Sequence, residues 1–232
     1  MDAAIYHFTD KSNNRPSVYQ KQVEILKRFA KENGWDATGV YVDFSLLKRD
    51  RKEFEHLMSE AEKYKILVVK DFYHLSKNTT RCMDILKELR DKGIEVHSIE
   101  NGFFQYEDIP LDKPLRVATY QSHYGYRKGG SIKADVQEEI FSSFIKKKTK
   151  WIYSGKYVDE MRIQNDSEQK ELMQLIQDHD QYDIILVRGL NDIHWRTSKF
   201  CSRREELKLD IYSLQDGFLR YGKEQYGRKC ST

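Results

Sequence analysis

Apolar residues in the first hundred positions follow two alternating periods. Four short runs are rich in apolar and β-branched residues, which is typical of strands. Between these runs, apolar residues recur at steps of three and four, the period of an amphipathic helix. The predicted strands are residues 4–8, 40–43, 66–69 and 94–99. Because the run 66–69 is apolar throughout, it predicts a strand buried on both faces of a parallel sheet.

Three predicted helices fill the intervals between these strands. The first opens at Pro16-Ser17, where Ser17 and Gln20 have capping-box spacing, and it ends at Asn33-Gly34. The other two are marked by apolar stripes, at Phe54, Leu57, Met58 and Ala61 and at Ile85, Leu86 and Leu89. Strands that alternate with helices predict a parallel sheet with helices on both sides.

Three segments of the first half return in the second half in the same order. They are 94–106 (as 209–221), 65–69 (as 183–187) and Trp35 with 40–43 (as Trp151 with 156–159). Collinear matches of this kind indicate a tandem duplication. The predicted fold class is therefore α/β, with two tandem domains, each a mainly parallel four- or five-stranded sheet flanked by helices.

The duplication also sets the expected domain boundaries. We expect a first domain at 1–106, a short linker at 107–114, a second domain at 115–221 and a tail at 222–232. The helical pattern is weaker at the first helix of the second copy, expected at about 134–148.

Composition narrows the functional classes only slightly. The chain has 232 residues with 40 basic and 37 acidic side chains, a net charge of +3 that is compatible with nucleic-acid contact but does not argue for it. Its three cysteines lack zinc spacing, so reduced thiols in a cytoplasmic protein are expected. The start of the chain does not resemble a signal peptide, and no apolar run approaches a membrane span. We expect no membrane association, no metal site and no cofactor.

A series of features in the first copy points to one family. Thr9-Asp10-Lys11 follows the first strand, Gly34-Trp35 precedes the second, Arg51-Lys-Glu-Phe54 opens the second helix, and His74-Leu-Ser-Lys77-Asn78 follows the third strand. This series resembles the catalytic domain of serine recombinases, the resolvase/invertase family, over about residues 4–104. The repeat implies a second resolvase-like domain.

The resemblance implies a specific chemistry. In that family a serine just after the first strand attacks the scissile phosphate of DNA, and several arginines hold that phosphate. A serine hydroxyl is a poor nucleophile and a phosphodiester repels anionic attack, so fixed cations must surround both. Guanidinium groups suit this role because they bind phosphate oxygens in pairs and stay protonated.

The first copy departs from this pattern. With Thr9-Asp10-Lys11 as the register mark, Phe8 stands at the nucleophile position and Tyr6 at the first-strand arginine position; a shift of two places Asp10 and Phe8 there instead. Ser12 lies beyond either position. The remaining family positions hold His74 and Lys77 in place of an arginine pair, and Arg51 as the one matching arginine.

The second copy has a serine without its cations. Ser122 falls at the nucleophile position. The arginine positions hold Tyr120, Asp192, Trp195 and, across a two-residue gap, either Gln169 or Ser167. We therefore predict that neither copy cleaves DNA and that no residue is catalytic, with Ser122 and Arg51 as the remaining candidates.

Two basic segments are candidates for phosphate or nucleic-acid binding. The loop 125–131 is glycine-rich and carries Arg127 and Lys128 between the expected first strand and first helix of the second copy. Lys146, Lys147, Lys148 and Lys150 precede Trp151, so cations and a stacking ring lie together. A plain flexible loop and a solvated helix end are the alternative interpretations.

The sequence thus predicts a pseudoenzyme that acts through binding. The expected partner is a protein, such as a recombinase or another nucleic-acid enzyme, with weak DNA binding and either an intrachain pseudodimer or a homodimer as further expectations. The resemblance implies a long dimerisation helix and a separate DNA-binding domain, for which no segment is evident after Phe104 or Tyr221. An origin in a mobile element or a phage would fit. The alternatives are a divergent recombinase or nuclease that uses Ser122 or Ser12, and a phosphate- or nucleotide-binding module built on 125–131.

Overall fold

The computed structural model describes residues 1–9, 16–44, 51–105, 114–124, 134–161, 169–219 and 221. The chain divides into two compact units, the first built mainly from Met1–Phe104 and the second mainly from Gln105–Trp195 and Ser202–Tyr221. Each unit is an α/β domain with a five-stranded, mostly parallel sheet flanked by helices. The predicted fold class is confirmed.

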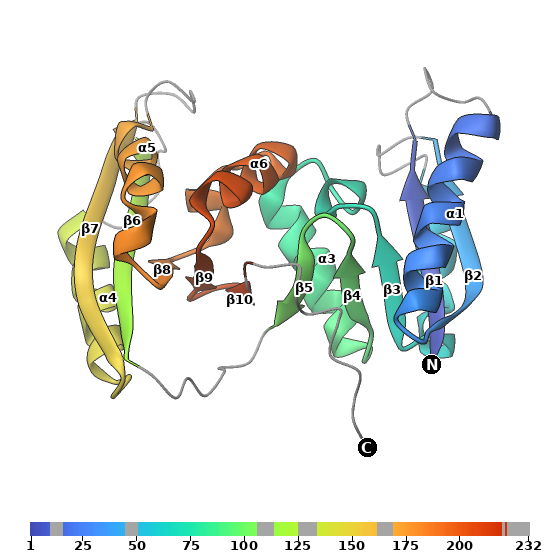
Figure 1. Cartoon of the computed structure of the whole chain (residues 1–232), viewed down its shortest axis with the longest axis horizontal. Coiled ribbons are helices and arrows are strands. Elements are labelled where there is room, and N and C mark those ends of the chain that lie inside the picture. The colour runs from blue at the N-terminus through green and yellow to red at the C-terminus, as the bar shows by residue number, and fades with distance from the viewer. Residues whose placement is uncertain are drawn as a thin grey trace. The chain divides into compact units, whose positions relative to one another are not determined.

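The sheet of the first unit has the order β2-β1-β3-β4-β5 (Figure 1). Its strands are β1 (Asp2–Phe8), β2 (Asp36–Asp43), β3 (Ile66–Val69), β4 (Glu95–Ser98) and β5 (Gly102–Gln105). The first four are parallel to their neighbours, and β5 pairs antiparallel with β4. All four residues of β3 are buried, as its apolar sequence predicts.

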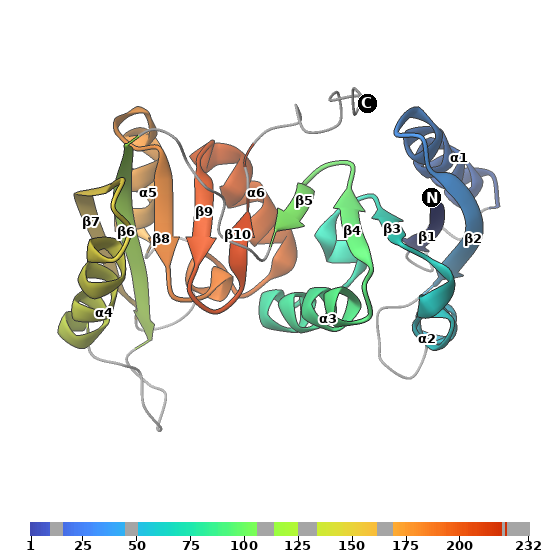
Figure 2. The same cartoon turned by 90° about the horizontal axis from the view of Figure 1, so that it is seen from below.

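Helices cover both faces of this sheet. Helix α1 (Pro16–Glu32) lies on one face, and α2 (Lys52–Ser59) and α3 (Thr79–Asp91) lie on the other (Figure 2). Short 3₁₀ turns, η3 (Ala61–Lys63) and η4 (Phe72–His74), precede and follow β3. The α1 face holds a core cluster of Ala3, Ile5, Leu26, Ala30, Ile66 and Val68.

The second unit repeats this topology. Its sheet has the order β7-β6-β8-β9-β10, with β10 antiparallel to β9. The strands are β6 (Leu115–Tyr124), β7 (Trp151–Met161), β8 (Ile184–Val187), β9 (Asp210–Ser213) and β10 (Gly217–Leu219). The helices are α4 (Ala134–Lys146), α5 (Lys170–Gln177) and α6 (Thr197–Leu207), with the 3₁₀ turns η6 (His179–Gln181) and η7 (Leu190–Asp192). Matching strand orders confirm the predicted equivalence of the two copies.

Two features of the sheets were left open or placed differently by the sequence prediction. Each copy has a fifth strand that the predicted element series lacked, and each of these strands begins at a glycine with positive φ, Gly102 (76°) and Gly217 (107°), which permits the sharp reversal from the preceding strand. Strand β2 begins at Asp36 rather than at residue 40 because its pairing with β1 continues through a register shift at Ala3/Ala4.

A repeated tyrosine pair ties the edge strand of each unit to the helix layer. The hydroxyls of Tyr41 and Tyr64 lie 2.7 Å apart, and those of Tyr157 and Tyr182 lie 2.8 Å apart. A Cβ at Gly39 would collide with the Tyr64 ring and hydroxyl. The tight packing explains why a glycine stands in a strand at this point.

Candidate functional site

In the first unit, the family's catalytic positions lie where β1 and β2 end and α2 begins. The Tyr6 hydroxyl donates to Asp43 Oδ2 at 3.1 Å. The Asp43 carboxylate also accepts the backbone N–H groups of Glu53 (3.1 Å) and Phe54 (3.0 Å), so it caps the start of α2. Burial raises the pKa of Tyr6 well above its usual range, and this hydroxyl therefore stays neutral.

Arg51, the one arginine that matches the family pattern, is held by the fold. Its Nη1 donates to the carbonyl oxygen of Leu75 at 2.8 Å, and its Nε donates to the Tyr6 hydroxyl at 3.3 Å. The guanidinium carbon lies 3.9 Å from the centre of the Phe54 ring. Nη2 has no hydrogen-bond partner among the described residues. Arg51 thus links β1, α2 and the segment after β3, and its side chain is buried.

Phe8, a candidate for the nucleophile position of the first unit, lies in an aromatic cluster. The Phe8 ring lies 6.3 Å from the Tyr73 ring and 6.2 Å from the His74 ring, and both contacts are edge-on. The Lys77 ammonium lies 5.9 Å from the ring centres of both Phe8 and Tyr73. His7 packs beside His74 with ring centres 5.0 Å apart. Rings and a cation therefore surround Phe8, the residue that one of the two registers of the resemblance places at the nucleophile position.

His74 replaces an arginine and pairs with a carboxylate. Its Nδ1 lies 2.9 Å from Asp71 Oδ1. Burial would raise the pKa of Asp71, but the hydrogen bonds and charge of His74 outweigh it, so the pKa is lowered. Burial and the neighbouring His74 lower the pKa of His7 to about 4, so His7 is neutral at physiological pH.

The second unit reproduces the same frame with one substitution. The Tyr120 hydroxyl donates to Asp159 Oδ2 at 3.0 Å, and Asp159 accepts the backbone N–H groups of Glu171 and Leu172 at 3.0 Å each. Gln169 Nε2 donates to the carbonyl oxygen of Ile193 at 2.7 Å and lies 3.5 Å from the Tyr120 hydroxyl.

Gln169 is therefore the structural counterpart of Arg51. Each residue is the N-cap of its helix, and each reaches the equivalent backbone carbonyl and tyrosine hydroxyl. This settles the choice that the sequence left open between Gln169 and Ser167. Ser167 lies outside the described residues.

Ser122 occupies the place of Phe8. Its Cα pairs with Asp159 across the parallel ladder, as that of Phe8 pairs with Asp43. The residue is only 7% exposed, and its Oγ has no hydrogen-bond partner among the described residues. The candidate nucleophile is thus a buried serine.

Acidic and aromatic side chains lie after β8, at the positions that the resemblance assigns to arginines. Asp192 is buried, and burial raises its pKa to about 6 even though Arg188 Nη2 lies 3.5 Å from its carboxylate. Gly189 N–H donates to Asp192 Oδ2 at 3.3 Å. The Trp195 ring stacks on His194 with ring centres 6.2 Å apart. A phosphate near Asp192 would meet negative charge above pH 6.

The basic segment after α4 is partly engaged in packing. The Lys148 ammonium lies 5.1 Å from the Phe144 ring centre, 6.0 Å from that of Trp151 and 5.9 Å from that of Tyr212. Lys146, Lys147 and Lys150 are exposed. The predicted phosphate-binding residues Arg127 and Lys128, together with Asp10, Lys11 and Ser12, lie outside the described residues. Within the described part of the chain, no group of His, Cys, Asp or Glu is arranged to hold a metal ion, and no helix is long and apolar enough to cross a bilayer.

Part of the chain matches a model of a known protein family. The model of the resolvase N-terminal domain matches residues 9–120, which begin just after β1 and end in β6. Over this stretch, just under half of its length, the chain is similar to the resolvase family. A comparison with curated proteins finds no match.

Three solved structures illustrate the likeness to serine recombinases. The C-terminal catalytic domain of ISC1926 TnpA, an IS607-like serine recombinase, is 19% identical over 43% of this chain and 70% of its own, with a TM-score of 0.39. The N-terminal catalytic domain of TP901-1 integrase is 20% identical over 44% and 79%, with a TM-score of 0.39. A resolvase-family site-specific recombinase from Streptococcus pneumoniae is 18% identical over 44% and 74%, with a TM-score of 0.38.

The duplicated frame makes a direct prediction for Arg51. Arg51→Gln should cost less than 1 kcal/mol, because Gln169 makes the equivalent hydrogen bonds in the second unit. Arg51→Ala should cost about 1–3 kcal/mol, because it leaves the carbonyl of Leu75 unpaired and removes the stack on Phe54. Urea unfolding of both variants checks this. If glutamine destabilises as much as alanine, the arginine charge has a role that the hydrogen bonds do not explain.

Proposed function

We propose that this resolvase-like protein has lost DNA cleavage and acts by binding, as a regulator or inhibitor. The observation that carries the proposal is the state of the two catalytic positions. In the first unit Phe8 stands at the position assigned to the nucleophile, and in the second Ser122 is buried beside a frame in which Gln169 takes the place of Arg51. Resolvase-family domains are normally catalytic, so the proposal concerns a change in this chain.

The loss of the nucleophile and the loss of the fixed cations each lower the rate of cleavage, and their effects combine. Serine attack on a phosphodiester needs a deprotonated hydroxyl and several fixed cations at the same phosphate. Removing one preorganised donor of this kind typically costs a factor of about 10²–10³ in rate. Here Arg51 is bound to a backbone carbonyl, Gln169 is neutral and Asp192 is acidic. An assay for covalent protein–DNA adducts tests the loss of cleavage directly.

The partner we propose is a protein, such as an active recombinase or another nucleic-acid enzyme, in the cytoplasm. A domain that keeps the family fold without its chemistry retains surfaces able to bind what the active relatives bind. A mobile element or a phage would be a fitting source. Capture from the native host, followed by mass spectrometry, identifies the partner.

Direct DNA binding should be weak. The net charge of +3 is small, and of the four candidate lysines Lys148 lies over three aromatic rings. At physiological salt we expect a dissociation constant for duplex DNA of about 10⁻⁶ M or weaker, within or near the usual range of non-specific binding. Fluorescence anisotropy with labelled duplexes measures it, and replacing Lys146, Lys147 and Lys150 by serine should weaken the residual binding further. Nanomolar, sequence-dependent binding would contradict this expectation.

A second candidate function is a divergent recombinase or nuclease that uses Ser122. The unpartnered Oγ is the observation that favours it, because a hydroxyl without a partner is free to react once exposed. The phosphate- or nucleotide-binding alternative rests on 125–131, which lies outside the described residues.

A further inference from the structure

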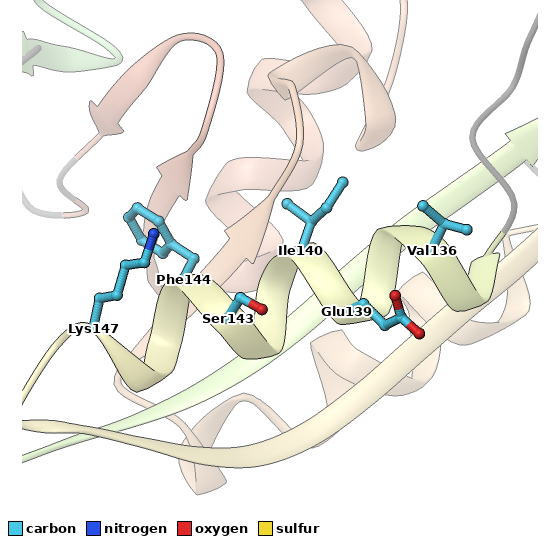
Figure 3. A pocket seen from close by; sticks show the side chains of 6 residues that line it. All are labelled: Val136, Glu139, Ile140, Ser143, Phe144 and Lys147. Carbon is cyan, nitrogen blue, oxygen red and sulfur yellow. The ribbon is translucent and has the colours of Figure 1, made fainter.

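Helix α4 presents an apolar stripe on its outer side. Its inner side packs Phe141 and Ile145 into the core of the second unit. On the outer side Val136 is 44% exposed and Ile140 is 40% exposed, and they project from the same side of the helix as Phe144 (Figure 3). A surface depression of about 390 Å³ follows this side, lined by Val136, Glu139, Ile140, Ser143, Phe144 and Lys147.

The equivalent helix of the first unit shows which part of this stripe is particular to α4. Phe29 packs edge-on against Trp35 as Phe144 packs against Trp151, so α1 and α4 align turn for turn. That alignment pairs Ile25 with Ile140, and both are 40% exposed.

Two of the positions around the two isoleucines differ in charge: their residues are charged on α1 and uncharged on α4. Where α4 has Val136 and Ser143, α1 has Lys21 and Arg28. On α1 the charge is satisfied locally, since Arg28 lies 3.9 Å from Glu32. Ile140 and Phe144 thus have equivalents in Ile25 and Phe29, and the outer side of α4 differs from that of α1 in carrying Val136 and Ser143 where α1 carries charge.

We propose that α4 packs antiparallel on α4 of a second copy of this chain, about a twofold axis through Ser143. The small side chain of Ser143 lets the two helices approach closely at the axis. Glu139 and Lys147 lie four residues before and after it, so an antiparallel pair places Glu139 of each copy opposite Lys147 of the partner subunit. Ile140 and Phe144 of both copies then meet between these two charge pairs.

Charge complementarity favours a second copy over another occupant. Neither Glu139 nor Lys147 makes an ion pair with another described residue, and the twofold arrangement satisfies all four charges at once. The apolar and charged positions are self-complementary, which is what an isologous interface requires.

The dimer should be weak. Helix α4 has 13 residues and is therefore about 20 Å long. A single pair of such helices buries less than the roughly 1,200 Å² of a standard stable interface. We expect reversible dimerisation with a dissociation constant of about 10–100 µM. The inference does not depend on the loss of cleavage, and either can fail without the other.

Sedimentation velocity of the full chain over a concentration series tests the dimer. The wild-type sedimentation coefficient should rise with concentration up to about 300 µM, above the expected dissociation constant. Ile140→Glu should abolish the rise, while Ile25→Glu, at the matching and equally exposed position of α1, should leave it unchanged. A wild-type protein that stays monomeric, or a dimer that Ile140→Glu does not weaken, overturns the proposal.

Charge reversal identifies the antiparallel pairing itself. Glu139→Lys and Lys147→Glu should each weaken self-association about three- to tenfold, because each creates two like-charge pairs. An equimolar mixture of the two variants should associate at least as well as the wild type, because every facing pair in the mixed dimer is then opposite in charge. A mixture that associates no better than the single variants overturns the α4–α4 pairing and indicates an intrachain contact or another partner.

Discussion

Asp192→Asn should raise the free energy of unfolding at pH 8 by about 2–3 kcal/mol, an unusual gain for the removal of a charge. Burial raises the pKa of Asp192 to about 6 in the folded chain, against an ordinary value of 3.8. Above pH 6 the folded state therefore holds a buried carboxylate whose desolvation the neighbouring Arg188 only partly offsets. Asparagine keeps the shape and an oxygen acceptor for Gly189 N–H without the charge.

The direction of the pH dependence follows from proton linkage. Between about pH 4 and pH 6 the folded state binds more protons at Asp192 than the unfolded state does, so stability falls as the pH rises through this window. At pH 4 the variant and the wild type should have nearly equal stability, and their difference should open as the pH rises to 7.

Urea unfolding of the full chain between pH 4 and pH 8, followed by tryptophan fluorescence, measures this difference. Asp180→Asn is the matched control, because the Asp180 side chain is 91% exposed and its charge should not affect stability measurably. An Asp192→Asn variant that is less stable than the wild type at pH 8 would show that the carboxylate stabilises the fold. That result would also leave open an electrostatic role for it in the second unit.

Sequence patterns predicted the elements whose signals are local. The runs 66–69 and 184–187 coincide with β3 and β8, because a short, continuous apolar run is typical of a strand that is buried on both faces of a parallel sheet. The sequence prediction allowed a fifth strand but did not locate it, because Gly102–Gln105 and Gly217–Leu219 are only four and three residues long. The dipeptides Asn101-Gly102 and Asp216-Gly217 are the sequence signal that could have located these strands, because such pairs are typical of hairpin turns. In the structure both glycines have positive φ.

The roles of the candidate site residues depend on contacts that no local pattern shows. Arg51 looks like a retained catalytic arginine in the sequence, but its donors reach Leu75 and Tyr6, which are distant along the chain. In the sequence Lys148 is a candidate phosphate ligand, but in the structure its ammonium lies beside the Tyr212 ring. The equivalence of Ser122 and Phe8 is one of the two registers that the sequence left open, and it is seen only in the pairing of Phe8 with Asp43 and of Ser122 with Asp159.

The largest expected effect is a null result with DNA. The wild-type protein should neither nick DNA nor form a covalent adduct, because a missing donor typically costs a factor of about 10²–10³ and each unit lacks several. In the second unit the negative charge on Asp192 above pH 6 adds repulsion. In the first unit no serine stands on β1 at the position of Phe8.

The covalent-adduct assay tests the central claim most directly. Purified full-length protein is incubated with supercoiled plasmid and with labelled oligonucleotides of random sequence, beside Ser122→Ala and Ser12→Ala variants and an active serine recombinase on its own substrate. We predict uncut plasmid and no SDS-stable protein–DNA adduct from the wild type or either variant. An adduct formed by the wild type and abolished by Ser122→Ala would contradict the account and identify this protein as a working recombinase or nuclease.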